Sequence, residues 1–389
     1  MQRRFVNPPF FSIILAILAS SPAISEILLS ALPPSGVLLL SVIGLLLVAS
    51  MIFYRGDNVK TITIITCVPI YLSVYLNVLL IGDLQYGGFK LLTGLWFPII
   101  CYALTPKSLH LKGILLGVLI FASAVAVSAI FYKSYVGGFW QRPVRFGLLG
   151  SITFAWMMAA AMLVSIWLAV EENKRRYVML SILFATLMLW SGSRGPTLLS
   201  LLVASAYVFY KRPAIVVKSF FVGVLAFFPV IILYPELLDN RILLIVSRLI
   251  DAAFELNLVE AWELLGLRGI YWGMAFASLT QWPFTGIGLG NFPQMWPNAV
   301  HIYPHNFVLE ALSELGWVIG VILFSTILYR VIRKRNIVTL LAVQFGVFLL
   351  VSGDLSYARY MIFFLLLSGG VGRHFPSYPD FSQYKEEVA

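Results

Sequence analysis

The feature that most constrains this chain is a series of long apolar runs that carry almost no charge. One of them starts after His305 and continues to Tyr329, with Glu310 and Glu314 as its only charged residues. A helix needs about 20 apolar residues to cross the hydrocarbon layer of a membrane. The chain is 60% hydrophobic and 11% charged, whereas soluble domains have ~45–50% apolar and ~25% charged residues. The runs are continuous and do not alternate, so the sequence predicts an all-α polytopic membrane protein.

The apolar runs predict about twelve membrane spans. Their ranges are 10–32, 36–54, 61–82, 88–104, 113–132, 146–170, 177–192, 196–210, 215–234, 306–329, 337–352 and 355–372. This divides the chain into four parts: nine spans within 1–234, a loop over 235–305, three spans within 306–372 and a tail over 373–389.

The distribution of Lys and Arg predicts which side of the membrane each loop faces. With the N-terminus inside, eighteen of the 27 basic residues fall on the cytoplasmic side and nine on the outer side. This bias is typical of short cytoplasmic loops, so the net charge of +10 indicates topology and not nucleic-acid binding. The outer cations include Arg142, Arg145 and Arg194. Cations where topology disfavours them are candidates for binding an anion.

The long segment before His305 falls on the outer side. Residues 239–265 place apolar side chains at near-helical spacing among charged ones, which is typical of an amphipathic helix at a membrane surface. Residues 268–281 predict a second helix, and a stretch rich in Gly and Pro follows it as an ordered, irregular loop. We therefore expect a helical lid over the outer face.

The turn around Arg194 has the composition of a phosphate site. Ser193 and Arg194 stand between two apolar runs, with Gly192 and Gly195 to permit a tight turn and Pro196 in the first turn of the next helix. Backbone N–H groups at a helix start, serine hydroxyls and a guanidinium together suit an anion. The alternative is a plain turn whose arginine reaches lipid headgroups.

His305 is the candidate general base. A neutral imidazole near pH 7 can accept a proton from a hydroxyl. Asn306, Glu310 and Glu314 follow at intervals of four and share one helix face, so a carboxylate could orient the imidazole. The alternative is a capped helix start with a hydrogen-bonded histidine.

Asp354 and Arg359 lie in the outer connection between the last two spans. They could join the same site or pair with each other. The charge-derived topology places Arg194, Arg268, His305 and Asp354 on one face of the membrane. The sequence shows no His/Cys cluster with metal-ligand spacing and no nucleotide loop, so this set suggests a substrate that carries its own activated phosphate, such as a lipid-linked diphosphate sugar.

These residues resemble the motifs of a known family. Arg194 to Leu198 reads R-x3-L, and His305 to Gly316 reads H-x10-G. Arg268, followed by Trp272, Pro283 and Gly286-Ile287-Gly288, is similar to an outer-loop arginine segment. Their order, spacing and shared side resemble the O-antigen ligase family, within the superfamily that includes O-antigen polymerases and protein O-oligosaccharyltransferases.

The resemblance implies a GT-C-type fold with a periplasmic lid, in the bacterial inner membrane. It implies glycan transfer from undecaprenyl diphosphate to a sugar hydroxyl of lipid A–core, with no metal or other cofactor. Arg194 and Arg268 would bind the diphosphate and His305 would activate the acceptor, with inversion. We expect further substrate contacts from Arg142, Arg145, Ser193, Asn306, Glu314 and Asp354.

Two other functions remain open. A polymerase that extends an O-antigen or exopolysaccharide on its lipid carrier would use the same site. A lipid-linked sugar transporter would also be polytopic and basic, but it should carry charges or broken helices near the middle of its spans. The predicted spans place no Lys or Arg there.

Overall fold

The computed structural model describes residues 58–104, 111–136, 150–214, 267–296, 303–333 and 336–371. The predicted spans 10–32, 36–54 and 215–234, the amphipathic segment 239–265, and Arg142 and Arg145 lie outside these residues. Within the described part, every regular element is a helix, which confirms the all-α class.

The described helices follow the predicted apolar runs. They are α4 (Asn58–Leu80), α5 (Tyr86–Lys90), the π-helix η1 (Leu91–Trp96), α6 (Phe97–Leu104), α7 (Leu111–Val136), α8 (Ser151–Glu172), α9 (Arg175–Trp190), α10 (Arg194–Lys211), α14 (Leu267–Gln281), α15 (Phe292–Met295), α16 (Phe307–Arg333), α17 (Ile337–Ser352), the 3-10 helix η3 (Leu355–Tyr357) and α18 (Ala358–Val371). The helix predicted over 268–281 is confirmed as α14.

Three of the described helices are long and apolar enough to cross a membrane: α7, α8 and α16. They support a membrane protein, because an apolar helix of this length has its backbone groups satisfied internally and can lie in lipid. The total of about twelve spans and the GT-C architecture remain predictions.

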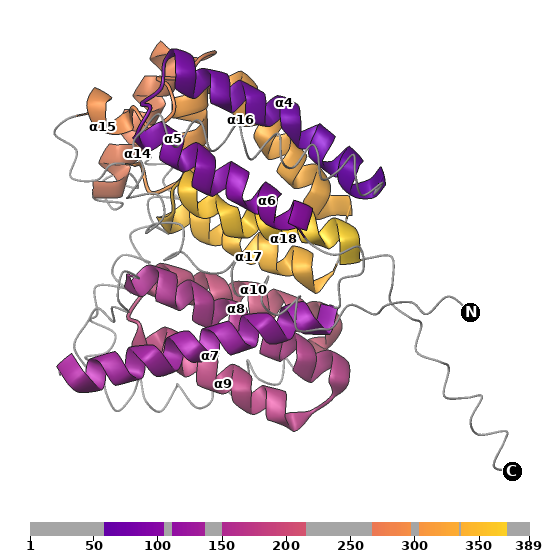
Figure 1. The fold of residues 1–389 in the computed structure, drawn as a ribbon. Coiled ribbons are helices and arrows are strands. Elements are labelled where there is room, and N and C mark those ends of the chain that lie inside the picture. The colour runs from indigo at the N-terminus through magenta and orange to yellow at the C-terminus, as the bar shows by residue number, and fades with distance from the viewer. Residues whose placement is uncertain are drawn as a thin grey trace, which may run out of the picture.

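Two groups of helices meet along α17 and α18. Figure 1 shows α7, α8, α9 and α10 in one group, and α4, α5, α6, α14, α15 and α16 in the other, with α17 and α18 between them. Trp156 of α8 is buried at this junction, where its ring lies 5.7 Å from that of Phe348 and 6.4 Å from that of Phe345. Aromatic packing across the junction therefore joins the two groups.

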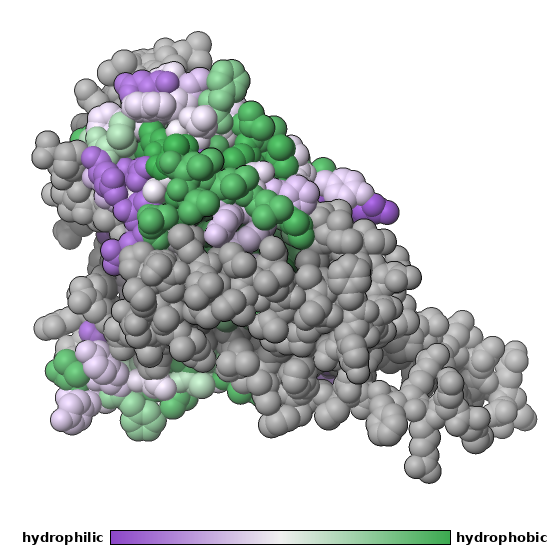
Figure 2. Space-filling model, turned by 45° about the horizontal axis from the view of Figure 1, so that its top comes forward, coloured by the Kyte–Doolittle hydropathy of each residue, from purple (hydrophilic) through white to green (hydrophobic). Residues whose placement is uncertain are grey.

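The outer surface of the helices is apolar where lipid is expected. α4 exposes Leu72, Leu76, Leu79 and Leu80. Figure 2 shows apolar side chains in a broad continuous area in the upper half of the view, with hydrophilic ones collected along its left margin. An apolar area of this extent on a protein surface marks contact with a membrane or a partner.

α16 is broken at Gly316, although the sequence predicts one continuous span over 306–329. Gly316 has φ 78°, in the left-handed region. At this break, backbone hydrogen bonds connect α16 to the loop after α14. Ile287 N donates to Ser313 O over 2.9 Å, and Trp317 N donates to Pro283 O over 2.7 Å. A Cβ at Gly316 would collide with the carbonyl of Phe284. Glycine permits both the conformation and the close approach.

The run predicted over 88–104 is also irregular. It forms α5, six residues of π-helix in η1, and then α6. A Cβ at Gly94 of η1 would collide with the carbonyl of Leu355 in η3. The π segment therefore brings the α5 end of this run into backbone contact with η3. Such π-helical turns are frequent at functional sites.

Acidic and basic side chains pair with one another where α7 and α9 begin and where α8 and α10 end. Lys112 and Lys174 pair with Glu172 over 3.2 and 2.9 Å, and Lys211 pairs with Glu171 over 2.9 Å. At the other end of α10, a Cβ at Gly195 would lie 3.2 Å from Val351, near the C-terminus of α17. The Arg194 turn therefore lies at the end of the bundle where α17 leads into Asp354.

Candidate functional site

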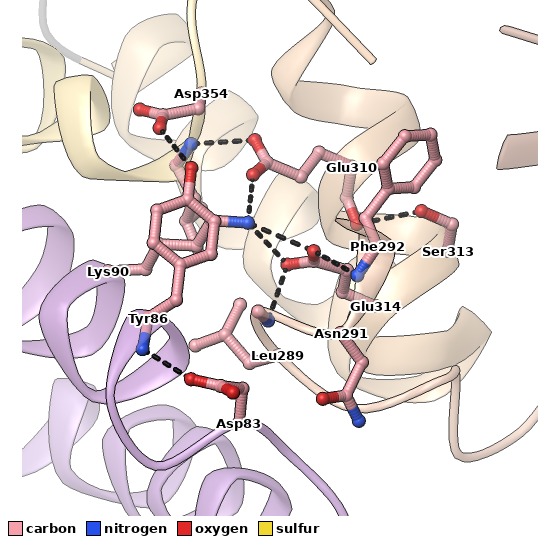
Figure 3. A network of polar contacts seen from close by, with 12 residues as sticks. Asp83, Tyr86, Lys90, Leu289, Asn291, Phe292, Glu310, Ser313, Glu314 and Asp354 are labelled. Carbon is pink, nitrogen blue, oxygen red and sulfur yellow. Dashed lines mark hydrogen bonds and ion pairs between the residues drawn. The ribbon is translucent and has the colours of Figure 1, made fainter. Parts of the chain in front are cut away.

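Lys90 is the centre of a buried charge cluster (Figure 3). Its side chain and those of Glu310 and Glu314 are fully buried. Its Nζ lies 2.5 Å from Glu310 Oε1 and 2.9 Å from both carboxylate oxygens of Glu314. Buried charges are tolerated when they are paired and hydrogen-bonded. Lys90 therefore joins α5, at the start of the apolar run 88–104, to the first turns of α16.

The two carboxylates hold different parts of the chain. Glu310 Oε2 accepts a hydrogen bond from Leu355 N over 2.7 Å, which ties α16 to η3. Glu314 accepts from Gly290 N over 3.0 Å and from Phe292 N over 3.4 Å, which ties α16 to the loop after α14. All four carboxylate oxygens thus have partners. Glu314 is predicted from sequence to contact substrate, and in the structure it holds this loop.

Asp354 and Tyr86 extend the cluster. Tyr86 Oη donates to Asp354 Oδ2 over 3.3 Å, and Lys90 Nζ lies 4.5 Å from the centre of the Tyr86 ring. Asp354 Oδ1 also accepts from Tyr357 N over 3.2 Å and from the hydroxyl of Ser356, so it caps η3. One lysine is thus placed among the carboxyl groups of three acidic residues.

His305 has an unusual backbone conformation directly before α16. Its φ is 56°, in the left-handed region that few residues other than glycine adopt. The imidazole is half-buried and lies 4.4 Å from the Tyr303 ring and 6.3 Å from the Tyr271 ring of α14. Backbone strain of this kind costs of order 1–3 kcal/mol and clusters at functional sites. The strain supports a functional role for His305.

Tyr303 connects His305 with Arg268 and Asp354. Burial raises the pKa of the Tyr303 phenol above its usual range, the negative charge of Asp354 raises it further, and the Arg268 guanidinium opposes this rise. A charge shifts the pKa of another group in this way only when the two groups lie near one another. The structure therefore brings three predicted site residues, His305, Arg268 and Asp354, to one region around Tyr303.

The Arg194 turn has the local form that its sequence predicts. Gly192 adopts φ 73°, Ser193 N donates to Ser191 Oγ over 3.1 Å, and the Ser193 carbonyl accepts from Thr197 N over 3.3 Å. Ser193 is buried and Arg194 is exposed at the first position of α10. An exposed guanidinium at a helix start is available to an anion.

Asn306 has a structural role at the start of α16. Its Oδ1 accepts hydrogen bonds from Val308 N over 3.0 Å and from Leu309 N over 3.1 Å. This is an N-cap, which satisfies N–H groups that have no partner within the helix. The helix therefore begins at Phe307, one residue after the start of the predicted span 306–329. Substrate contact by Asn306 remains a prediction.

Sequence reasoning missed Lys90 and Tyr86 as members of the site. Lys90 is counted there only as an outer cation, because its partners lie 220 or more positions further along the chain. The available signal was a lysine at the head of an apolar run on the side that also carries Glu310, Glu314 and Asp354. Such a buried cation requires counter-charges, and these three carboxylates are among the candidates on that side.

Fold and site together define a helical membrane protein with a buried polar cluster where α5, α16 and η3 meet. Residues 179–325 match the family model described as O-antigen ligase. This segment contains Arg194, Arg268, His305 and Gly316, so the resemblance indicated by the motifs is confirmed there, and the matched family is associated with ligase- or polymerase-type activity. Lys90, Asp354 and Arg359 lie outside the matched segment. No curated protein matches the chain.

Proposed function

We propose that this protein is an O-antigen ligase of the bacterial inner membrane, with its site facing the periplasm. It transfers a glycan from undecaprenyl diphosphate to a sugar hydroxyl of lipid A–core. The observation that carries this proposal is the grouping of His305, Tyr303, Arg268 and Asp354 at the entrance of α16. An imidazole, a guanidinium and a carboxylate in one region support the proposal, and His305, Tyr303 and Arg268 belong to the segment that matches the family.

The proposed reaction is a single displacement at the anomeric carbon of the donor sugar. His305 takes the proton of the acceptor hydroxyl, whose oxygen forms the new glycosidic bond. The bond from the anomeric carbon to the diphosphate breaks on the opposite face, so the configuration inverts. Arg194 and Arg268 stabilise the negative charge that develops on the leaving diphosphate, a contribution of about 2.7–4 kcal/mol for one donor in a preorganised site.

The donor supplies the energy of the reaction in the bond between its sugar and the diphosphate, so this mechanism requires no cofactor. The proposed partners are the lipid-linked donor, the lipid A–core acceptor and the bilayer. Arg142, Arg145 and Ser193 remain proposed substrate contacts. The Lys90 cluster acts indirectly, because it fixes the start of α16 and with it the position of His305.

Replacement of His305 by Ala tests the mechanism. Loss of general-base catalysis typically lowers the rate by about 10²–10⁴-fold, whereas binding of the lipid-linked donor should persist. Transfer is measured with purified protein, donor and acceptor, and donor binding is measured separately. His374→Ala is the matched control, because the sequence assigns His374 to the cytoplasmic tail. Full transfer by the His305→Ala protein would refute the mechanism.

Surface glycan from a deletion strain separates ligase from polymerase. For a ligase, all long chains disappear from lipid A–core and lipid-linked polymer accumulates. For a polymerase, single repeat units remain attached to the core. Gel separation of the surface glycan distinguishes these two patterns.

A further inference from the structure

Arg359 is a buried cation with unsatisfied donors. It lies in the first turn of α18 and its side chain is 2% exposed. Among the described residues it forms no ion pair. Its Nε and Nη2 have no hydrogen-bond partner in the same part of the chain. Burial of a charged group without partners is costly, and such groups in native proteins call for an explanation.

Asp354 does not neutralise Arg359 through a direct contact. Its carboxylate oxygens accept from Tyr86 Oη, Ser356 Oγ and Tyr357 N, and it forms no ion pair with Arg359. The pairing of Asp354 with Arg359, one of the two possibilities in the sequence, is therefore absent. The other possibility, that both residues join the same site, fits the structure.

Two tyrosine rings lie close to the Arg359 guanidinium, but its Nε and Nη2 atoms remain without a hydrogen-bond partner in the described part of the chain. The guanidinium Cζ lies 5.4 Å from the centre of the Tyr357 ring and 5.1 Å from that of the Tyr360 ring. These cation–π contacts recover part of the cost of burial. Nε and Nη2 still lack acceptors among the described residues, and N–H groups point outward in the plane of a guanidinium. That planar edge matches two oxygens of a phosphate group.

Tyr357 lies beside Arg359 and is more exposed than its neighbours in the chain. It is half-buried, whereas residues 352–356 and 358–361 are buried. Tyr357 also lies near enough to Tyr303 to act on it electrostatically, so Tyr357 belongs to the same region as His305.

We propose that Arg359 binds a phosphate group of the lipid-linked diphosphate, and that Tyr357 covers Arg359 while the site is empty. The inference rests on the proposed function for the identity of the ligand. The predicted site already contains the arginines Arg194 and Arg268. Arg359 adds a buried guanidinium, and it follows Asp354 in the chain whereas the other two precede it. An anion at the start of α18 would also be favoured by the helix dipole.

The test measures binding of geranyl diphosphate, a short isoprenyl diphosphate, to the purified full-length protein. Arg359→Gln should raise the Kd about tenfold or more, as expected for a lost charge-assisted hydrogen bond to phosphate. The Kd of Arg359→Lys should lie between those of the wild type and Arg359→Gln, because lysine keeps the positive charge but lacks the planar fork of donors. Geraniol, which lacks the diphosphate, should bind the wild type and Arg359→Gln equally weakly.

Arg333→Gln is the matched control. Arg333 is an exposed arginine whose Cζ lies 5.6 Å from the Tyr329 ring, at the opposite end of α16 from His305. This variant should bind geranyl diphosphate like the wild type. A thermal melt without ligand provides a second readout. Removal of an unpaired buried charge should leave the Tm of Arg359→Gln equal to or above that of the wild type.

Three results would overturn the inference: an unchanged Kd for Arg359→Gln, a lower Tm or failure of that variant to fold, or equal binding of geraniol and geranyl diphosphate by the wild type. The second result would identify Arg359 as a structural residue. Arg359-dependent diphosphate binding without glycan transfer would refute the proposed function and leave this site intact. Glycan transfer with an unchanged Kd for Arg359→Gln would refute the Arg359 site and leave the proposed function intact.

Discussion

Gly316 gives the H-x10-G motif a physical meaning. Its φ of 78° and the close approach of the Phe284 carbonyl both exclude a side chain. Gly316→Ala should therefore destabilise the protein by about 1–2 kcal/mol through the backbone and by about 1–3 kcal/mol through the collision. Thermal unfolding in detergent measures the loss.

Gly150→Ala is the control for Gly316→Ala. Gly150 has φ −70°, and a Cβ there would meet no atom of the described residues within 4 Å. The Tm of the Gly150→Ala protein should equal that of the wild type within experimental error. Equal melting temperatures for Gly316→Ala and Gly150→Ala would show that the break in α16 tolerates a side chain.

Lys90→Met should be among the most damaging single substitutions in the described part of the chain. It leaves Glu310 and Glu314 buried without their cation, and loss of one partner from a buried ion pair costs about 3–5 kcal/mol. The triple variant Lys90→Met, Glu310→Gln, Glu314→Gln should recover part of that loss, because no unpaired charge remains. Unfolding midpoints of the single and triple variants measure the coupling.

Lys112→Met is the matched control for Lys90→Met. Lys112 also pairs with a glutamate, but its side chain is 72% exposed. Exposed pairs contribute about 0–1 kcal/mol, so its midpoint should change little. A similar loss in both lysine variants would contradict the role of burial in the Lys90 cluster.

The limits of sequence reasoning at the residue scale have a common cause. Asn306 stands before an apolar run, where an N-cap is expected, and its capping bonds could have been inferred from that position alone. The pairing of Lys90 with Glu310 and Glu314 depends on how α5 and α16 lie in space. Local periodicity carries no information on such long-range contacts.

At the scale of elements, the two glutamates of α16 should have separable effects. Glu314→Gln weakens the attachment of the loop around Gly290 and Phe292, whereas Glu310→Gln weakens that of η3 at Leu355. Amide hydrogen exchange read by mass spectrometry should therefore rise over 286–296 in the first variant and over 354–358 in the second. Each variant serves as the control for the other. An identical exchange pattern in both would indicate one cooperative unit and not two attachments.

Hydropathy predicts the described helices well and their irregularities poorly. α17 begins and ends where the sequence places it, because its apolar run is bounded by Asn336 and Gly353. The π segment η1 and the break in α16 are absent from the prediction. Both arise where another segment approaches closely, Leu355 beside Gly94 and Phe284 beside Gly316. A glycine in an apolar run marks such approaches, but it does not identify the partner.

At the scale of the whole molecule, the helix ends divide the charged residues into two sets. Lys112, Lys174 and Lys211 meet Glu171 and Glu172 at one end. α10 runs over 18 residues from Arg194 to Lys211, about 27 Å at about 1.5 Å per residue. Arg194 and Lys211 are therefore near opposite ends of the bundle, as the prediction from Lys and Arg requires.

Single-cysteine labelling tests on which side of the membrane the candidate site lies. Cys67 and Cys101 form no disulfide in the structure, so a background with both replaced by Ala can carry new cysteines. Tyr135, 93% exposed at the end of α7, marks the predicted outer end, and the exposed Arg212 after α10 marks the cytoplasmic end. A membrane-impermeant maleimide should label Tyr135→Cys in spheroplasts and Arg212→Cys only after permeabilisation. The opposite pattern would place His305 and Arg194 in the cytoplasm, where a periplasmic ligase could not use them.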